Sequence, residues 1–105
     1  MDKTLLGGKI RIVRKEKGMT GETLAEICNI NATYLRQIES GAKMPSLPVF
    51  ISVCRALEAS PSYLLSDILG EAESDELQKL WQTATPKQIR MISAIIRSAL
   101  ENMEE

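Results

Sequence analysis

The stretch Thr20–Glu39, TGETLAEICNINATYLRQIE, constrains the fold of this chain more than any other part of the sequence. Thr20 is a favoured N-cap residue, because its hydroxyl can accept a hydrogen bond from a free amide in the first turn of a helix. Asn29 tolerates the left-handed backbone that ends a helix, and Asn31 is a second N-cap candidate. The pattern therefore predicts two short helices joined by a tight turn, as in a helix-turn-helix.

A first helix is predicted before this stretch. Leu6, Ile10 and Val13 are spaced so that they share one face of a helix, which we expect to run from Leu5 or Leu6 to Lys17. The glycines at positions 7 and 8 weaken its start.

Two further helices are predicted after it. Ser46 is placed to cap a fourth helix, and Ser60 followed by Pro61 is the N-cap and first-turn pairing typical of a fifth. We expect the fifth helix to continue until Gly70. The acidic, polar residues 71–75 that follow are the best candidate for a linker.

The length of 105 residues, with 44% hydrophobic and 26% charged residues, is typical of one globular domain with a short appendage. We place the domain at residues 1–70. Residues 71–105 then hold the acidic linker and a C-terminal helix. The expected class is all-α.

The final segment, Lys87–Met103, carries an apolar stripe wider than a solitary helix can leave in water. The stripe consists of Ile89, Ile92, Ile96, Ala99 and Met103. We expect it to form a homodimer contact, and the alternative is that it packs back on the first and fifth helices of its own chain.

Several absences narrow the possible functions. The chain has no histidine, which removes the commonest general base and a common metal ligand. Cys28 and Cys54 are interpreted as buried, reduced thiols. No glycine-rich phosphate loop is present, so we expect neither an enzyme nor a cofactor.

No apolar run reaches the roughly 20 residues of a membrane span, and no signal-peptide segment begins the chain, so we expect a cytoplasmic protein without a membrane partner.

The net charge of −1 is unevenly distributed along the chain. Residues 1–70 carry nine Lys and Arg against seven Asp and Glu, whereas residues 71–105 carry four against seven. The first two-thirds are therefore mildly basic. For a nucleic-acid partner this distribution matters more than the sum.

A resemblance to the phage repressor/Cro-type (XRE-like) helix-turn-helix family is carried by IRIVRKEKGMTGETLAEICNINATYLRQIESGAKMPSLPVFISVCRALEASPSYLL. The match covers about Leu6 to Ile68 with several anchors in register. These are Arg14, Gly18, Leu24-Ala25, Ile38-Glu39-Ser40-Gly41, Pro45-Ser46-Leu47 and Ala56-Leu57. The resemblance implies a five-helix repressor-like DNA-binding domain, here followed by a C-terminal helical extension.

In that family the third helix reads bases in the DNA major groove. The resemblance implies base contacts from Ala32, Thr33, Arg36 and Gln37. Their chemistry suits this role, because glutamine can pair with adenine, arginine with guanine, and the methyl groups of alanine or threonine can meet thymine. The alternative is an ordinary solvated helix face.

Contacts to the DNA backbone are expected from Thr20, Gly21, Asn31 and Lys43, through side chains and through amides at helix N-termini. The family usually has glutamine at the first residue of the second helix, where its side chain clamps DNA. This chain has Gly21 there, so only the backbone amide could donate. The departure bears on DNA affinity and not on the fold.

The resemblance also implies a partly buried ion pair between Arg14 and Glu39, which would tie the first helix to the end of the third. We assign it a structural role. Removing one partner of a deeply buried pair strands a charge and costs roughly 3–5 kcal/mol.

The favoured function is a sequence-specific transcriptional repressor that binds double-stranded DNA as a homodimer on an inverted-repeat operator. Its half-sites would lie about one helical turn apart, or a multiple of it. The alternative is an antitoxin-like or anti-regulator module that uses the same scaffold to bind a protein partner, with weak DNA binding. Because no ligand domain is visible, regulation by a protein is expected rather than by a small molecule.

Overall fold

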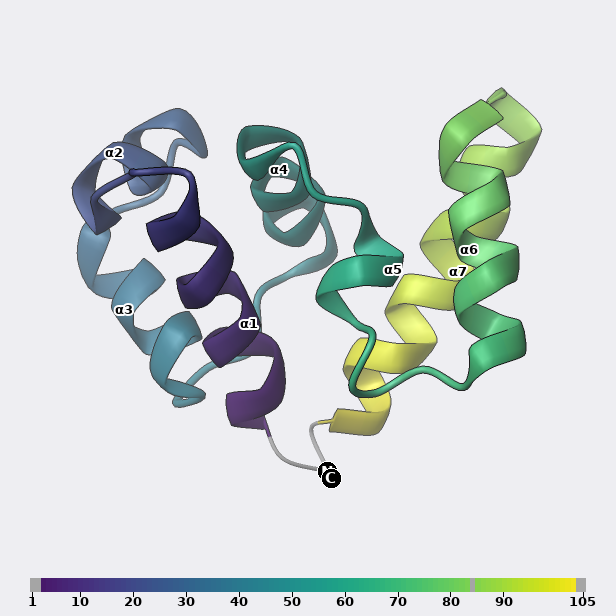
Figure 1. Cartoon of the computed structure of the whole chain (residues 1–105), viewed down its shortest axis with the longest axis horizontal. Helices are drawn as coiled ribbons and strands as arrows, with labels where there is room; N and C mark the ends of the chain where they lie inside the picture. Colours follow the sequence, from purple (N-terminus) through teal and green to yellow (C-terminus); the bar gives the residue numbers. More distant parts are fainter. Residues whose placement is uncertain (1–2, 84, 104–105) are drawn as a thin grey trace.

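A computed structural model describes residues 3–83 and 85–103 of the chain, with side chains for residues 4–83 and 85–101. Within these ranges the chain is all-helical, as predicted, and no strand occurs (Figure 1). The helices are α1 (Lys3–Glu16), α2 (Gly21–Ile27), α3 (Ala32–Ser40), α4 (Leu47–Leu57), α5 (Pro61–Leu64), α6 (Glu71–Thr83) and α7 (Pro86–Met103).

The start of α4 and the start of α5 follow the predicted caps. The Ser46 hydroxyl accepts from the Val49 amide at 3.4 Å, and the Ser60 hydroxyl accepts from the Tyr63 amide at 3.2 Å. Each cap satisfies an amide that the helix itself leaves without a partner. The first helix begins at Lys3, earlier than predicted, because the two glycines do not prevent helix formation there.

At Gly7 the backbone of α1 lies very close to the backbone of α3. A Cβ atom at this position would lie 2.2 Å from the carbonyl oxygen of Ile38 and 2.6 Å from that of Glu39. The residue that weakens α1 as an isolated helix is thus the one that lets the backbone of α3 lie against it. Leu6 and Ile10, on the predicted stripe, are fully buried beside this contact.

One hydrophobic cluster contains the buried residues of both the first five helices and the last two. Phe50 and Leu57 of α4 belong to it together with Leu77 of α6 and Ile96 of α7. Burial of apolar side chains is the main favourable term in folding, so the last two helices contribute to the same core as the others.

The fifth helix is shorter than predicted. It comprises one turn, and the chain then continues to Gly70 through turns, in which the Ser66 amide donates to the Tyr63 carbonyl and the Ile68 amide to the Leu65 carbonyl. These bonds span three residues rather than four, which is a tighter geometry than an α-helix.

The prediction of a linker at residues 71–75 is wrong, because α6 begins at Glu71. The acidic residues that suggested a linker instead suit a helix N-terminus, where the helix dipole favours negative charge. A carboxylate oxygen of Glu73 also accepts from the Gly70 amide at 3.3 Å and so caps the helix.

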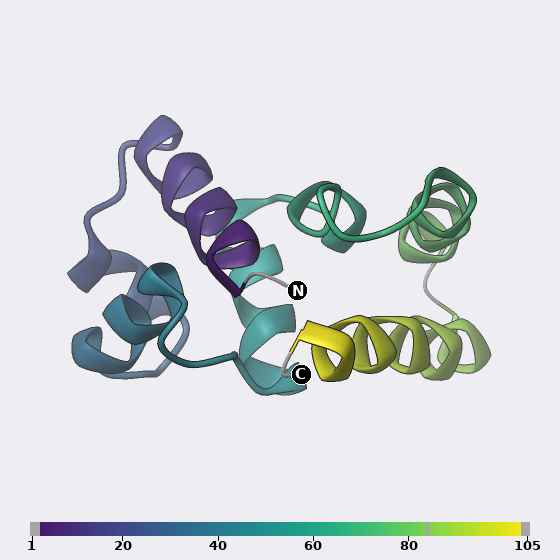
Figure 2. The same ribbon diagram turned by 90° about the horizontal axis from the view of Figure 1, so that it is seen from below.

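The helices α6 and α7 lie side by side in opposite directions and form a hairpin that packs on α5 and α4 (Figure 1). The view from below shows α2 and α3 at one end of the molecule and this hairpin at the other (Figure 2). The outer side of α3 is therefore left open.

Candidate nucleic-acid interface

The two helices and the turn of the Thr20–Glu39 stretch have the predicted caps. The Thr20 hydroxyl accepts from the Thr23 amide at 3.1 Å, and the Asn31 side-chain oxygen accepts from the Tyr34 amide at 2.7 Å. Asn29 has a φ of 57°, the left-handed conformation expected of it. Local side-chain chemistry thus sets where α2 ends and α3 begins.

The angle between α2 and α3 is held by buried side chains. Leu24 and Ala25 of α2 and Leu35 and Ile38 of α3 are all part of the core. The turn residue Ile30 packs against that core, and its amide donates to the carbonyl of Ala25 at 3.0 Å. The opposite side of α3 remains available to a partner.

Four side chains of α3 were predicted to read bases. Thr33 and Arg36 are exposed, while Ala32 and Gln37 are half-buried. The guanidinium of Arg36 donates to the Thr33 hydroxyl at 3.2 Å, which holds two of the four side chains together. This arrangement presents an arginine fork and a methyl-bearing side chain from a capped helix.

The predicted ion pair between Arg14 and Glu39 is present. Arg14 Nε lies 2.7 Å from Glu39 Oε2, and the two side chains are 12% and 9% exposed. A further Arg14 nitrogen donates to the carbonyl of Met19 at 2.9 Å. Both the carboxylate at the end of α3 and the loop before α2 are thereby tied to α1.

Arg11 also belongs to this surface, although its sequence context does not single it out. It is exposed, and with Arg14, Arg36, Glu39 and Ser40 it lines a hollow of about 350 Å³ between α1 and α3. Arg11 and Arg14 are three residues apart and so lie on neighbouring positions of α1. This spacing is the one feature of the sequence that could have indicated Arg11. Two exposed guanidinium groups, those of Arg11 and Arg36, therefore border one depression.

A second hollow, of about 200 Å³, lies where α2 begins. Gly21 lines it together with Ala32, Leu35 and Arg36, and so does the carboxylate-bearing Glu22. A Cβ atom on Gly21 would lie 3.9 Å from the nearest atom of Leu35, an ordinary contact distance. The position at which the family usually has a glutamine is thus open to a longer side chain.

The loop after α3 is fastened to the helix by its backbone. The Lys43 amide donates to the carbonyl of Gln37 at 3.1 Å, and Gly41 ends the helix with a φ of 83°. The side chain of Lys43 is exposed. Its predicted contact with a phosphate is sterically open, and so are those of Thr20 and Asn31, whose side chains are also exposed.

The residues predicted for dimerisation are placed differently. Ile92, Ile96 and Ala99 are buried in the core of a single chain, whereas Ile89 is 47% exposed. The side chain of Met103 lies outside the described residues. The apolar stripe of α7 packs on α6 and α4 of the same chain, and this contact buries most of it. The alternative of intramolecular packing named the first and fifth helices instead.

The cysteines are buried and reduced, as interpreted from the sequence. Burial raises the pKa of the Cys28 thiol, and it raises the pKa of Cys54 to about 12. A thiol reacts as its thiolate, so neither group is suited to nucleophilic chemistry. Among the described residues, no cluster of His, Cys, Asp and Glu could hold a metal ion, and no helix is long and apolar enough to cross a membrane.

Comparison with known proteins agrees with the helix-turn-helix geometry described above. A family model described as helix-turn-helix matches residues 10–64. The immunity repressor of Bacillus phage phi105 is 30% identical over 94% of this chain and 67% of its own length. The control protein C.BamHI of Bacillus amyloliquefaciens is 37% identical over 58% of this chain and 76% of its own.

Other relatives match about three-fifths of this chain. The transcriptional regulator PrpR of Mycobacterium tuberculosis is 28% identical over 62% of this chain, which spans only 13% of PrpR. Among solved structures, the clp gene regulator ClgR from C. glutamicum superposes with a TM-score of 0.59 at 37% identity, covering 62% of this chain and 84% of that one.

Proposed function

This chain belongs to the helix-turn-helix family whose model matches residues 10–64, and on that premise we propose that it is a sequence-specific DNA-binding repressor acting in the cytoplasm. The observation that carries the proposal is the open side of α3. Arg36 and Thr33 are exposed there on a helix that is capped at its start and tied to α1 by the Arg14–Glu39 pair at its end. A rigid helix with donors on its free side is what base readout in the major groove requires.

Positioning on the DNA backbone is proposed for two groups. Thr20, Gly21 and Asn31 lie at the N-termini of α2 and α3, where backbone amides and the helix dipole attract phosphate. Lys43, in the loop after α3, and Arg11, on α1 beside α3, are both exposed and supply positive charge near that helix. Such contacts fix the register of a protein on DNA without reading sequence.

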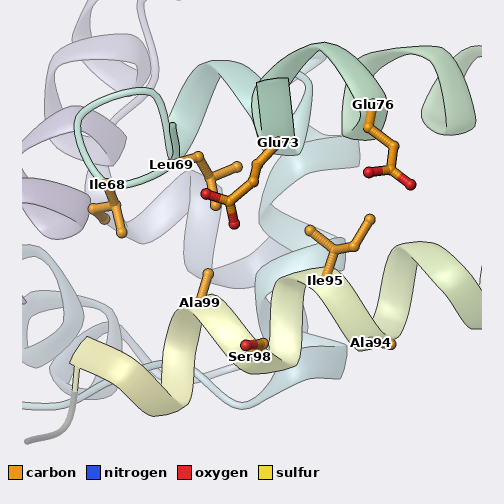
Figure 3. Close-up of a pocket in the computed structure, with 8 residues that line it drawn as sticks. All are labelled: Ile68, Leu69, Glu73, Glu76, Ala94, Ile95, Ser98 and Ala99. Carbon is orange, nitrogen blue, oxygen red and sulfur yellow. The ribbon is translucent and has the colours of Figure 1, made fainter. Parts of the chain in front are cut away.

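A homodimer on an inverted repeat is the second part of the proposal. Since most of the apolar stripe of α7 is buried, a second copy would meet the other side of this helix, where Met91 and Ala94 are exposed. A groove of about 420 Å³ between α6 and α7 runs beside them (Figure 3). The carboxylates of Glu73 and Glu76 project over that groove, as the close-up shows.

Positive charge also lies beside this groove, because Arg97 is exposed on α7 one helical turn after Ala94. A surface with both signs of charge can be self-complementary across a two-fold axis. In sedimentation experiments, Ala94→Arg should then shift a dimer toward monomer. Ala72→Arg, at an exposed position on α6, serves as the matched control and should leave the dimer intact.

Selection of bound DNA from a random pool tests the function directly. The expected result is an enriched inverted repeat, with affinity that falls steeply with salt. Enrichment of a single half-site would support base readout and argue against the dimer.

The alternative, a regulatory module that binds a protein partner, is favoured by the open space beside Gly21 and by the acidic Glu22 that lines it. If no DNA is retained even at low salt and a protein co-purifies with the chain, that alternative replaces the proposed function.

A further inference from the structure

A hollow of about 310 Å³ lies between α4 and the α6–α7 hairpin. Its walls are Ile51, Arg55, Trp81, Ile89, Ile92 and Ser93. The volume is within the range of small-molecule pockets, roughly 300–1,000 Å³. The hollow joins α4, which lies inside the matched helix-turn-helix region, to a hairpin that lies outside it.

Most of the lining is apolar and incompletely covered. Ile89 is 47% exposed, and Trp81 and Ile51 are only half-buried although all three face the same hollow. Binding of an apolar ligand would remove these side chains from water, which is energetically favourable. An apolar body is therefore the first requirement for a ligand at this position.

The polar groups of the hollow are a guanidinium and a hydroxyl, those of Arg55 and Ser93. Within the part of the chain that the structure describes, no carboxylate lies within ion-pair distance of Arg55, and none lines the hollow. Arg90 is exposed one helical turn before Ser93, which adds to the positive charge at the rim. The second requirement is therefore an anionic head.

We propose that this hollow binds a small amphipathic carboxylate. The carboxylate pairs with the planar fork of Arg55, a geometry that matches two oxygens at once, and accepts a hydrogen bond from the Ser93 hydroxyl. The apolar chain of the ligand covers Trp81 and Ile89.

A second copy of the chain is a poorer occupant. A two-fold interface puts the same patch of both copies together, so the cations Arg55 and Arg90 of one copy would meet a patch that carries the same two cations. Like charges across an interface oppose association. The charge of this hollow is positive, whereas the groove in Figure 3 is lined by the carboxylates of Glu73 and Glu76 and would repel a carboxylate.

The test uses the full chain without DNA, so its outcome is independent of the proposed function. Trp81 is the only tryptophan of the chain and lines this hollow, so its fluorescence should respond to a ligand bound there. Octanoate, octanol and octylamine are titrated as matched probes that differ only in the head group, and amide shifts in nitrogen-15 NMR spectra map where each one binds.

Octanoate should give a saturable change in Trp81 fluorescence and shift the amides of Ser93 and Ile89, and it should bind at least tenfold more tightly than octanol. Arg55→Gln should remove that preference and leave octanol binding unchanged. Lys79→Gln, which removes an exposed cation from α6 outside the hollow, should preserve it.

Three outcomes would overturn the proposal. The first is equal binding of octanoate and octanol. The second is the absence of saturable shifts at Ser93 and Ile89 with folded protein. The third is a dimer that Ile89→Asp converts to monomer, which would mean that a second copy covers the hollow.

Discussion

Arg14 and Glu39 form a two-point ion pair that joins α1 to the end of α3. Arg14 Nε donates to one carboxylate oxygen at 2.7 Å, and a terminal nitrogen donates to the other at 3.0 Å. These hydrogen bonds, more than the accompanying charge of Glu39, raise the pKa of Arg14 further above its ordinary value. The pair fixes the helix that we propose to read DNA.

Replacing Arg14 with Met should destabilise the protein by roughly 2–3 kcal/mol, because the partly buried carboxylate of Glu39 would be left without its partner. Urea denaturation measures the loss. The double variant Arg14→Met/Glu39→Leu should recover most of it, since no isolated charge is then buried. A single variant within about 1 kcal/mol of the parent would show that water reaches the Glu39 carboxylate.

Gly7 and Gly8 should respond in opposite ways to alanine. Gly7→Ala pushes a methyl group into the backbone of α3 and should cost roughly 1–3 kcal/mol or more. Gly8→Ala meets no atom within 4 Å and should stabilise the helix by roughly 0.5–1 kcal/mol. Thermal unfolding of the two variants in parallel measures the contrast. Similar behaviour of both variants would contradict the close approach of α1 and α3.

Gly21→Gln should tighten DNA binding. The hollow beside Gly21 has room for the side chain, and a hydrogen bond to a charged phosphate contributes about 1.5–3 kcal/mol, which is roughly tenfold or more in affinity. Gly21→Ala adds the Cβ atom without the amide and should change affinity little. The measurement is a binding titration on the selected operator at fixed salt, and equal affinities for Gln and Ala would exclude the side-chain clamp.

Alanine substitutions at Arg36 and Arg11 should affect DNA binding in different ways. Arg36→Ala should cost about 1–3 kcal/mol on the best operator and relax preference at one base position. Arg11→Ala should weaken all sequences alike and reduce the salt slope by about 1, as expected for one lost phosphate contact. Competition titrations at several salt concentrations separate the two effects. An unchanged base preference for Arg36→Ala would remove Arg36 from the reading surface.

Cys54 should make the protein less stable in alkali. Its pKa is raised to about 12 in the folded state, chiefly by burial, whereas an unfolded thiol titrates at about 8.5. Between these values the unfolded chain has lost a proton that the folded chain retains, so the free energy of unfolding falls as pH rises.

The loss assigned to Cys54 should reach roughly 2–3 kcal/mol between about pH 8.5 and about pH 10.5. Urea denaturation of the parent and of Cys54→Ala isolates it, because the other titrating groups are common to both. A difference between the two proteins that does not change with pH would mean that Cys54 titrates as an exposed thiol.

Much of the interface follows from local chemistry that the sequence already displays. Thr20, Asn29 and Asn31 act through hydrogen bonds and backbone conformations that span only a few residues, so their roles are visible without a fold. The Arg14–Glu39 pair is not local, and it was foreseen only through the resemblance to a family. Arg11 was missed because its proximity to Arg36 depends on how α1 crosses α3.

The sequence by itself determined the capped starts of α2, α3, α4 and α5, the turn between α2 and α3, and the apolar faces of α1 and α7, because these depend on caps and on the periodicity of apolar residues. Only the tertiary structure decided what each face is buried against. The stripe of α7 could have met a second chain, but α6 and α4 cover Ile92, Ile96 and Ala99 within one chain. The hydrophobic effect has no direction, so an amphipathic pattern predicts burial without identifying the partner.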